Sequence, residues 1–386
     1  MADTSPLARI LAPFDESTFL RDYWTRRALL LQDGDRARFD GLFGLDDLEE
    51  YLFVAQPSAG DVQLVRQGQW PPMGMVKGLF RPQSYDVQAL YNGLDAGYTI
   101  VLNAAHLRWP ATRKLVAELE DQLLATLQTN IYVTGPNAQG FSRHSDEHDV
   151  LVLQTHGAKR WQVFDKPRDG GEPALLHEVE LTRGDVLYMP QGFPHAAATS
   201  GEYSIHVTVG IFPLTWHDLA RQTLDHLAQQ DARWRDSVPL PGLGAEALPP
   251  VSALSDRLRD GLGSLPDFQT VFAGYARGLT TTARRKNPPP GGYLQSITTL
   301  DRLDIDAMVE RRSGVGCAVT AGPDSAAIHF MGETIRTPAK ALEALRFIAA
   351  HPRFRVGDIA GVLNADAKLV LVKRLIREGL LQASRP

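Results

Sequence analysis

The stretch that decides the fold reads Asn130-Ile131-Tyr132-Val133-Thr134, then a polar loop with Phe141-Ser142-Arg143-His144-Ser145-Asp146, then Val150-Leu151-Val152-Leu153-Gln154 and Gly157-Ala158-Lys159-Arg160-Trp161. The apolar, β-branched runs on either side of the loop predict β-strands. A loop held between two strands can fix side chains for a ligand without packing them into a core. The His-x-Asp pair at 144 and 146 is therefore the first candidate for chemistry.

A second histidine joins this pair from later in the chain. The run at 184–189 predicts another strand, which leads through two prolines and a glycine to His195. Two imidazoles and one carboxylate on strand ends form a three-point metal face with open coordination positions, an arrangement associated with non-haem Fe(II). The predicted ligands are His144, Asp146 and His195.

The same loop offers a competing set of ligands. His148 could complete a His-x-Asp-x-His cluster with His144 and Asp146. That choice of ligands would give His195 and Lys159 no role at the site, which favours the set of ligands that includes His195. A lone His-x-Asp pair is more often a hydrogen-bonded loop pair than a metal site, so the hypothesis depends on the polar side chains around it.

Side chains on the flanking strands indicate what the metal face would bind. Asn130 and Tyr132 lie two residues apart and share one face of a strand, as do Lys159 and Trp161 on the next strand. A buried, unpaired ammonium is costly, so Lys159 needs an anionic guest. A dicarboxylate bound to the metal at one end and to Lys159 at the other would satisfy these groups.

Composition places the chain among ordinary globular proteins. Its 386 residues exceed the usual size of one domain and predict two or three. A net charge of -5 argues against nonspecific nucleic-acid binding by the whole chain. The single Cys317 excludes an internal disulfide and a cysteine-based zinc cage, and suits a reducing compartment. Because the sequence has no N-terminal apolar segment and no membrane-length apolar run, we expect a soluble cytoplasmic protein without membrane contact.

The first part of the chain predicts a mixture of helices and strands, and strands become frequent after residue 130. Turns rich in Gly, Pro, Asn or Asp separate them, as in a β-sandwich or barrel. The longest predicted helix of this part spans 108–127. The predicted strands are 28–31, 61–66, 98–102, 130–134, 150–154, 160–164, 177–181, 185–189 and 203–212.

The strand at 203–212 has the clearest pattern. Its apolar side chains alternate with Ser204, His206, Thr208 and Gly210, so one face is apolar and the other polar. A polar face turned toward a ligand cavity explains this alternation, and a solvent-facing sheet surface explains it equally well.

After residue 213 the pattern changes to helices. Residues 216–230 and 251–262 have helical periodicity, and residues 284–292, which combine basic residues with Pro and Gly, read as a linker. Short strands followed by three helices are typical of a winged-helix module. Residues 336–386 hold ten Lys or Arg against four Asp or Glu, which permits nucleic-acid contact without establishing it. The predicted elements are strands at 316–320, 326–331 and 334–336 and helices at 338–350, 356–363 and 367–378.

Together the motifs resemble the JmjC-type, cupin-fold Fe(II) and 2-oxoglutarate oxygenases, and among them the ribosomal oxygenases. The resemblance rests on the Asn-x-Tyr-x-Thr strand, the Gly-Phe-x-x-His-x-Asp loop, the His-Asp-Val strand start, the Lys-x-Trp pair and the Gly-Asp segment that leads to the second histidine. It extends to residues 19–24 and covers nearly the whole chain. It implies an α+β protein with a double-stranded β-helix (cupin or jelly-roll) JmjC domain at 1–213, a helical dimerisation domain at 214–290 and a winged-helix domain at 291–386.

The resemblance also implies the iron ligands and the chemistry. The family's catalytic iron-binding positions match His144, Asp146 and His195. Members of the family convert 2-oxoglutarate and O2 to succinate and CO2 while hydroxylating a substrate C–H. Mn, Co or Ni could occupy the same ligands in a purified sample.

The implied cosubstrate pocket involves further positions. The family position that holds the distal carboxylate of 2-oxoglutarate matches Lys159, and positions that line the cosubstrate pocket match Asn130 and Tyr132. A serine late in the barrel often assists in the family. This chain has Gly210 there, and we expect Thr208 to substitute for it.

The function implied by the resemblance is hydroxylation of an Arg or His side chain of a ribosomal protein. It further implies a homodimer formed through the helical domain and a winged helix that contacts protein rather than nucleic acid. Two alternatives stay open. The same iron site could serve a biosynthetic peptide or small metabolite, or the barrel could be a non-catalytic metal-binding cupin whose basic winged helix binds nucleic acid as a regulator.

Overall fold

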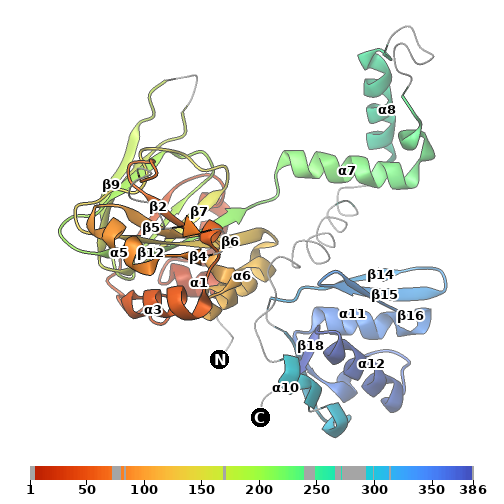
Figure 1. Cartoon of the computed structure of the whole chain (residues 1–386). Helices are drawn as coiled ribbons and strands as arrows, with labels where there is room; N and C mark the ends of the chain where they lie inside the picture. The colour runs from red at the N-terminus through yellow and green to blue at the C-terminus, as the bar shows by residue number, and fades with distance from the viewer. Residues whose placement is uncertain are drawn as a thin grey trace. The chain divides into compact units, whose positions relative to one another are not determined.

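A computed structural model describes residues 5–71, 80–81, 84–167, 171–238, 248–265, 271, 293–298, 300–312 and 314–384 (Figure 1). The chain divides into two compact units. The first contains the described residues up to Pro213, together with two short later segments, and the second begins at Leu214.

Two antiparallel sheets form the first unit. The larger has the strand order β1-β10-β7-β12-β6-β5-β2 and the smaller β11-β8-β9, so a late strand, β12, lies between β6 and β7. This interleaving of non-consecutive strands is typical of a jelly roll. The strands are β1 (Leu29–Leu31), β2 (Val62–Val65), β5 (Thr99–Leu102), β6 (Thr126–Thr134), β7 (Asp149–His156), β8 (Ala158–Phe164), β9 (Leu175–Thr182), β10 (Val186–Met189), β11 (His195–Ala198) and β12 (Ser204–Phe212).

Helices and turns pack on the larger sheet. The longest, α6 (Pro110–Leu123), has proline at its first position, where the missing N–H costs nothing, and packs on β6. The other elements of this unit are α1 (Pro6–Leu11), α2 (Glu16–Thr18), η1 (Phe19–Tyr23), α3 (Leu45–Glu50), η2 (Tyr51–Ala55), η3 (Ala59–Asp61), the short pair β3 (Phe80–Arg81) and β4 (Ser84–Tyr85), α5 (Val87–Asp95) and η4 (Ala105–Leu107).

The two faces of the larger sheet belong to different hydrophobic cores. Along β7, Leu151 and Leu153 belong to the core shared with the helices, whereas Val150 and Val152 belong to a second core with residues of the smaller sheet. Because successive side chains of a strand point to opposite faces, this central strand is apolar on both. The second core therefore lies inside the barrel, beside the candidate site.

The alternation in β12 has a clear structural reason. Its four Ile and Val residues belong to the helix-side core, while His206 and Thr208 on the other face are buried and line a pocket. The interpretation that this polar face is turned toward a cavity is therefore confirmed, and the solvent-facing alternative is wrong.

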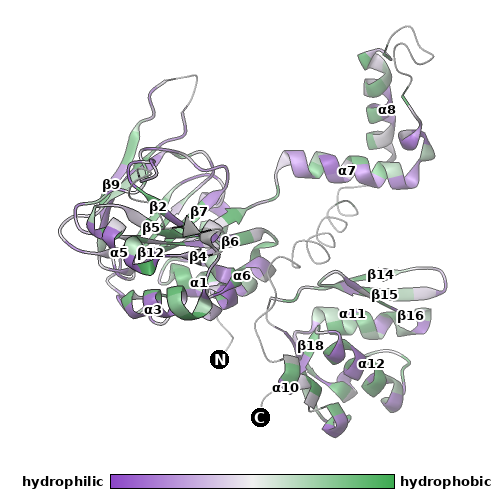
Figure 2. Ribbon diagram, viewed as in Figure 1, coloured by the Kyte–Doolittle hydropathy of each residue, from purple (hydrophilic) through white to green (hydrophobic). Residues whose placement is uncertain are grey.

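The second unit contains a helical segment. It comprises α7 (Trp216–Gln230), η5 (Ala232–Arg235) and α8 (Val251–Ser264). The α7 and α8 helices approach closely at Gly261, where an added Cβ would lie 2.8 Å from Leu227. Figure 2 shows apolar residues along both helices, and several are exposed. Within the described residues, no helix is long and apolar enough to cross a membrane.

The C-terminal part of the unit combines two three-stranded sheets, ordered β17-β13-β18 and β14-β15-β16, with the helices α11 and α12. The helix α10 (Tyr293–Thr298) belongs to the first unit. The elements that follow it are η7 (Leu300–Arg302), β13 (Met308–Arg311), β14 (Ala318–Ala321), β15 (Ser325–Phe330), β16 (Glu333–Pro338), η8 (Ala339–Ala341), α11 (Leu342–Ala350), β17 (Arg353–Arg355), η9 (Val356–Asp358), α12 (Ala365–Arg377) and β18 (Leu381–Ala383).

Most predicted elements are confirmed, with boundaries shifted by a few residues. The helix predicted at 356–363 is wrong, because only the short turn η9 forms there. Two glycines weaken a helix in this segment, and the N–H groups of Val356 and Gly357 bond instead to the loop before β13. The predicted linker at 284–292 lies outside the described residues.

Candidate metal centre

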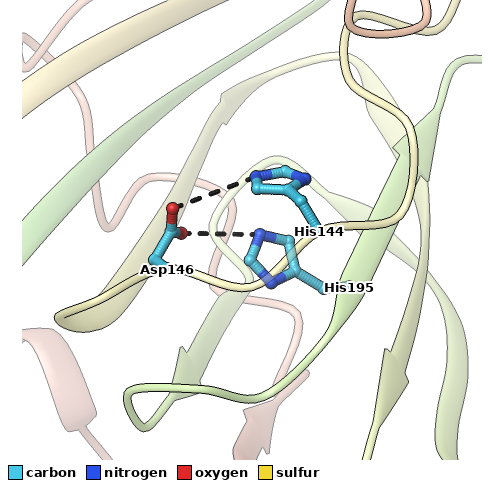
Figure 3. Close-up of side chains that lie close together, drawn as sticks. All are labelled: His144, Asp146 and His195. Atoms are coloured by element: carbon cyan, nitrogen blue, oxygen red, sulfur yellow. Dashed lines mark ion pairs between the residues drawn. The ribbon is translucent and has the colours of Figure 1, made fainter.

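The structure brings His144, Asp146 and His195 together. Figure 3 shows both imidazoles facing the carboxylate of Asp146. The Nε2 atom of His144 lies 3.9 Å from Asp146 Oδ1, and the Nε2 atom of His195 lies 3.7 Å from Asp146 Oδ2. The three donor atoms lie within 4.8 Å of one another. Since metal–ligand bonds are roughly 2.0–2.2 Å long, an ion fits between them.

Hydrogen bonds select the tautomer of both histidines. The Nδ1 atom of His144 lies 2.8 Å from the carbonyl of Ser142, and that of His195 lies 3.1 Å from the carbonyl of Phe193. A carbonyl can only accept, so each Nδ1 must carry a proton and donate it. Both Nε2 atoms then present a lone pair toward Asp146, as metal-binding histidines do.

Backbone hydrogen bonds join the two segments that carry the three side chains. The N–H of His144 donates to the carbonyl of His195 over 3.1 Å, and the N–H of His195 donates back over 2.8 Å. The N–H of Gly192 donates to the carbonyl of Asp146 over 3.0 Å. The loop before β7 and the loop before β11 are thus fixed to each other by protein groups alone.

The three side chains differ in exposure. His195 is 7% exposed, whereas His144 is 39% and Asp146 31% exposed, so the face opens toward solvent on the side of the His-x-Asp pair. Burial and the neighbouring His144 lower the pKa of His195. The neutral imidazole, which is the form that binds a metal, is therefore favoured.

A pocket extends from the triad into the barrel. Its empty space is about 480 Å³, part of which is open to solvent. Polar groups and aromatic rings line it, a composition suited to a small polar ligand. The lining residues are Thr99, Tyr132, Gly140, Phe141, His144, Asp146, Val150, Lys159, Trp161, His195, Ala197, His206 and Thr208.

Lys159 contributes a buried cation to this pocket. Its side chain is 3% exposed, and its Nζ donates to Thr134 Oγ1 over 2.9 Å. Within the part of the chain that the structure describes, no carboxylate lies at ion-pair distance from it. Burial lowers the pKa of Lys159 to about 7. An anionic ligand would restore the counter-ion that the protein does not supply.

Of the predicted pocket residues, Tyr132 and Thr208 line the cavity and Asn130 does not. The ring of Tyr132 stacks on His206 with centroids 4.7 Å apart, and burial raises the pKa of Tyr132 to about 12, so the phenol keeps its proton. The Oδ1 atom of Asn130 accepts from the N–H of Ala104 over 3.1 Å. The side chain of Asn130 also hydrogen-bonds to Tyr132, so it contacts a lining residue without lining the cavity itself.

Gly210 is not one of the residues that line the pocket. A Cβ added to Gly210 would lie 3.0 Å from the ring of His148. The Nδ1 atom of His148 lies 3.0 Å from the carbonyl of Asp149, and its ring packs against Phe212. His148 therefore occupies the space beside Gly210 and is not one of the three grouped donors.

His206 was not among the predicted site residues, although the sequence places it on the polar face of β12. Its buried Nδ1 and the buried Nε1 of Trp161 have no hydrogen-bond partner among the described residues, although both side chains line the pocket. Buried polar atoms without partners are rare and indicate a ligand or water. The available signal was the alternation of β12, which puts His206 on the same face as Thr208.

Several known proteins are similar in sequence to the part of the chain that contains this site. Residues 106–219 match the family model described as the JmjC domain. The chain is 31% identical over 242 residues to ribosomal oxygenase 1 of Rattus norvegicus, which covers 58% of this chain and 39% of that protein. It is 26% identical over 434 residues to the bifunctional lysine-specific demethylase and histidyl-hydroxylase NO66 of Drosophila mojavensis, covering 98% of this chain and 46% of that protein. The chain thus spans less than half the length of these relatives.

A solved structure matches almost from end to end. The Escherichia coli ribosomal oxygenase YcfD in complex with cobalt and 2-oxoglutarate superposes with a TM-score of 0.58 at 21% identity, covering 96% of this chain and 98% of that one. Its complex with cobalt and succinic acid gives a TM-score of 0.59. At this identity the likeness shows a shared cupin-type fold.

Proposed function

From the premise that this chain contains a JmjC domain of cupin-type fold and is similar to ribosomal oxygenases, we propose that it is an Fe(II)- and 2-oxoglutarate-dependent dioxygenase. We further propose that it hydroxylates an Arg or His side chain of a ribosomal protein. One observation carries this proposal. Two imidazole Nε2 atoms and one carboxylate converge in the same pocket that buries a lysine with no counter-ion among the described residues.

The proposed metal ligands are His144, Asp146 and His195. Two neutral imidazoles and one carboxylate suit Fe(II) and leave half of an octahedral sphere for other ligands. The cobalt in the YcfD structures supports this choice, because cobalt accepts similar donor sets. Each histidine is already in the tautomer that the ion needs.

The proposed cosubstrate groups are Lys159, Tyr132 and Thr208. The ammonium of Lys159, which the hydroxyl of Thr134 holds in place, would bind one carboxylate of 2-oxoglutarate, since a charge-assisted hydrogen bond satisfies the buried cation. The phenol of Tyr132 stays protonated and can donate. Asn130 would act through Tyr132, because its side chain hydrogen-bonds to Tyr132 and accepts from the N–H of Ala104.

With iron and 2-oxoglutarate bound, the site would supply oxidative decarboxylation to succinate and CO2 and transfer of one oxygen atom to a substrate C–H. The protein's own groups bind and orient the reactants. His195 and Trp161 are buried and line the inner side of the pocket, where they would limit the access of bulk water. The part-exposed pair His144 and Asp146 leaves the outer side open, so the substrate side chain would enter there.

The names of the relatives support the substrate class. They include ribosomal oxygenases and a histidyl-hydroxylase. The open side of the metal face admits a side chain from a protein surface, which favours a protein substrate over a fully enclosed metabolite. A biosynthetic peptide or small metabolite is the competing substrate that the experiment below separates from this proposal.

We also propose roles for the later parts of the chain. The domain limits that we propose are 1–213, 214–290 and 291–386. The middle domain would dimerise, because α7 and α8 expose Trp216, Val251 and Leu254. The last domain would be a winged helix that contacts protein, for which its two small sheets and the helices α11 and α12 are suitable elements.

The test compares purified protein with its Asp146→Ala variant. With Fe(II), O2 and 2-oxoglutarate, the wild-type protein is expected to form succinate and to add the mass of one oxygen atom to one ribosomal protein of its host. The variant is expected to fold and to do neither. Succinate without any modified ribosomal protein would refute the substrate and keep the oxygenase. No succinate at all would refute the oxygenase, as would unchanged turnover by the variant.

A further inference from the structure

The turn at residues 190–193, which precedes His195, is held in place by hydrogen bonds to residues outside the turn. The N–H of Phe193 lies 3.3 Å from the carbonyl of Pro190, and Gly192 at the third position has φ +83°, as in a type II turn. Such a turn leaves the N–H groups of its two central residues free for other partners. Gly192 donates to the carbonyl of Asp146, and Gln191 donates to the carboxylate of Asp149 over 2.8 Å.

The orientation of His195 depends on this turn. The Nδ1–H of His195 donates to the carbonyl of Phe193, the last residue of the turn. A displacement of the turn would move that carbonyl and rotate the imidazole away from Asp146. The position of the Gln191 N–H is therefore linked to the direction of the His195 Nε2 lone pair.

The side chain of Asp149 is itself held in place by burial and by a hydrogen bond. It lies at the start of β7, is 1% exposed, and its side chain shares a face with Leu151, which belongs to the helix-side core rather than the pocket. Its Oδ2 accepts a hydrogen bond from the hydroxyl of Tyr188. That hydroxyl in turn accepts from the N–H of Thr25 over 2.8 Å.

The far end of this chain of hydrogen bonds is in the N-terminal segment. Tyr188 is fully buried, with its ring stacked on Trp24 and edge-on to Phe19. Thr25 has φ +59°, a conformation that a β-branched residue rarely adopts, and this conformation accompanies the bond from its N–H to Tyr188. An unfavourable backbone conformation held in place indicates that the contact is specific.

We infer that Asp149 and Tyr188 are positioning residues for the metal centre, which hold the turn at 190–193 and through it the imidazole of His195. This inference rests on the proposed metal site. Neither residue is one of the three grouped donors or lines the pocket. They transmit the position of the N-terminal segment at Thr25 to the ligand across the larger sheet.

The test measures the Kd of Mn(II), used as a redox-stable probe, and the visible charge-transfer absorption of the anaerobic Fe(II)–2-oxoglutarate complex. The variant Asp149→Ala is expected to bind Mn(II) at least about tenfold more weakly, the usual effect of removing a group that supports a metal ligand. Asp149→Asn is expected to regain most of the affinity, because its amide oxygen can still accept from Gln191. The absorption band is expected to weaken or shift in Asp149→Ala.

Matched controls separate positioning from general stability. Glu120 is also a buried carboxylate that accepts a backbone N–H, that of Leu127 over 2.9 Å, and it lies outside the pocket lining. Glu120→Ala is expected to lower the melting temperature and leave the Mn(II) Kd unchanged. If Asp149→Ala does not fold, Tyr188→Phe is measured in its place, because this variant removes the hydroxyl and keeps the packing of the ring. Its control is Tyr51→Phe, since the buried hydroxyl of Tyr51 has no hydrogen-bond partner among the described residues.

The outcomes are distinct. Weaker binding by the Asp149 or Tyr188 variants, with unchanged binding by the Glu120 and Tyr51 controls, supports the inference. An Mn(II) affinity equal to that of the wild type in Asp149→Ala, or in Tyr188→Phe if that variant is used, overturns the inference. The proposed function would stay intact. If the wild-type protein itself binds no Mn(II) or Fe(II), the proposed metal site fails and the inference fails with it.

Discussion

The ammonium of Lys159 shows how one residue can couple ligand binding to pH. Its charged form is favoured only weakly in the free protein, because burial lowers its pKa to about 7. A bound carboxylate would favour the charged form and raise that pKa. Below pH 7 the lysine is already protonated, so affinity for 2-oxoglutarate is expected to be constant. Above pH 7 binding must take up a proton, and affinity is expected to fall by up to about tenfold per pH unit.

Calorimetry on metal-loaded, anaerobic protein checks this expectation. Titrations of 2-oxoglutarate between pH 6 and 9, in buffers of different ionisation enthalpy, report both Kd and proton uptake. The other groups near Lys159 do not titrate in this range, since burial lowers the pKa of His206 well below its usual value and raises that of Tyr132 to about 12. A Kd that stays constant up to pH 9 would contradict the role given to Lys159.

Replacing this lysine by a neutral side chain of similar length gives the complementary prediction. Lys159→Met is expected to raise the Kd of 2-oxoglutarate about 10- to 150-fold, the equivalent of about 1.5–3 kcal/mol for a hydrogen bond to a charged group. The pH dependence described above is expected to vanish. The ligand-free variant is expected to melt at a higher temperature than the wild type at neutral pH, because a desolvated ammonium has been removed. A variant that melts lower and binds normally would show that Lys159 is structural.

At the scale of the element, the turn between β7 and β8 determines where Lys159 lies. Gly157 in this turn has φ +62°, and a Cβ there would lie 1.9 Å from the carbonyl oxygen of Tyr203. Gly201 has φ +63° and nothing within 4 Å of the same position. Gly201→Ala is thus expected to cost about 1–2 kcal/mol of unfolding free energy from backbone strain alone. Gly157→Ala is expected to cost about 1–3 kcal/mol more, because the clash is with backbone.

Denaturant unfolding of both variants measures the difference. The pair has the same substitution and nearly the same φ, so the comparison isolates the contact with Tyr203. Equal destabilisation of the two variants would mean that the β7–β8 turn can relax away from β12.

The frequent short strands after residue 130, the His-x-Asp loop and the segment that leads to His195 were sufficient to predict the barrel and the three grouped side chains. Strand β11 was not predicted, because Ala196, Ala197 and Ala198 have no preference for a strand, and they form one by pairing with β8. The contact between Asp149 and Tyr188 could not be predicted from the sequence either. It joins residues 39 apart in sequence through strand pairing, and nothing in either local sequence specifies the partner.

At the scale of the whole molecule, the exposed apolar side chains of α7 and α8 carry the prediction of a dimer. In α8, Val251 is 81% and Leu254 56% exposed, and apolar side chains three residues apart on one helix face form the kind of patch that marks an interaction site. Leu254→Glu is expected to convert a dimer to a monomer in light scattering after size-exclusion chromatography. Ser252→Glu adds the same charge to the same helix at an exposed polar position and is expected to stay dimeric. A wild-type monomer, or dissociation by both variants, would contradict a dimer interface at Leu254.

The reciprocal backbone bonds between His144 and His195 have a consequence for the life of the protein in the cell. The hydrogen bonds that orient the two imidazoles are made between protein groups, so the chain is expected to fold before any ion binds. Iron scarcity would then leave a reserve of dormant, correctly folded molecules. Such a reserve would respond within the time of metal diffusion once supply recovered, with no new synthesis.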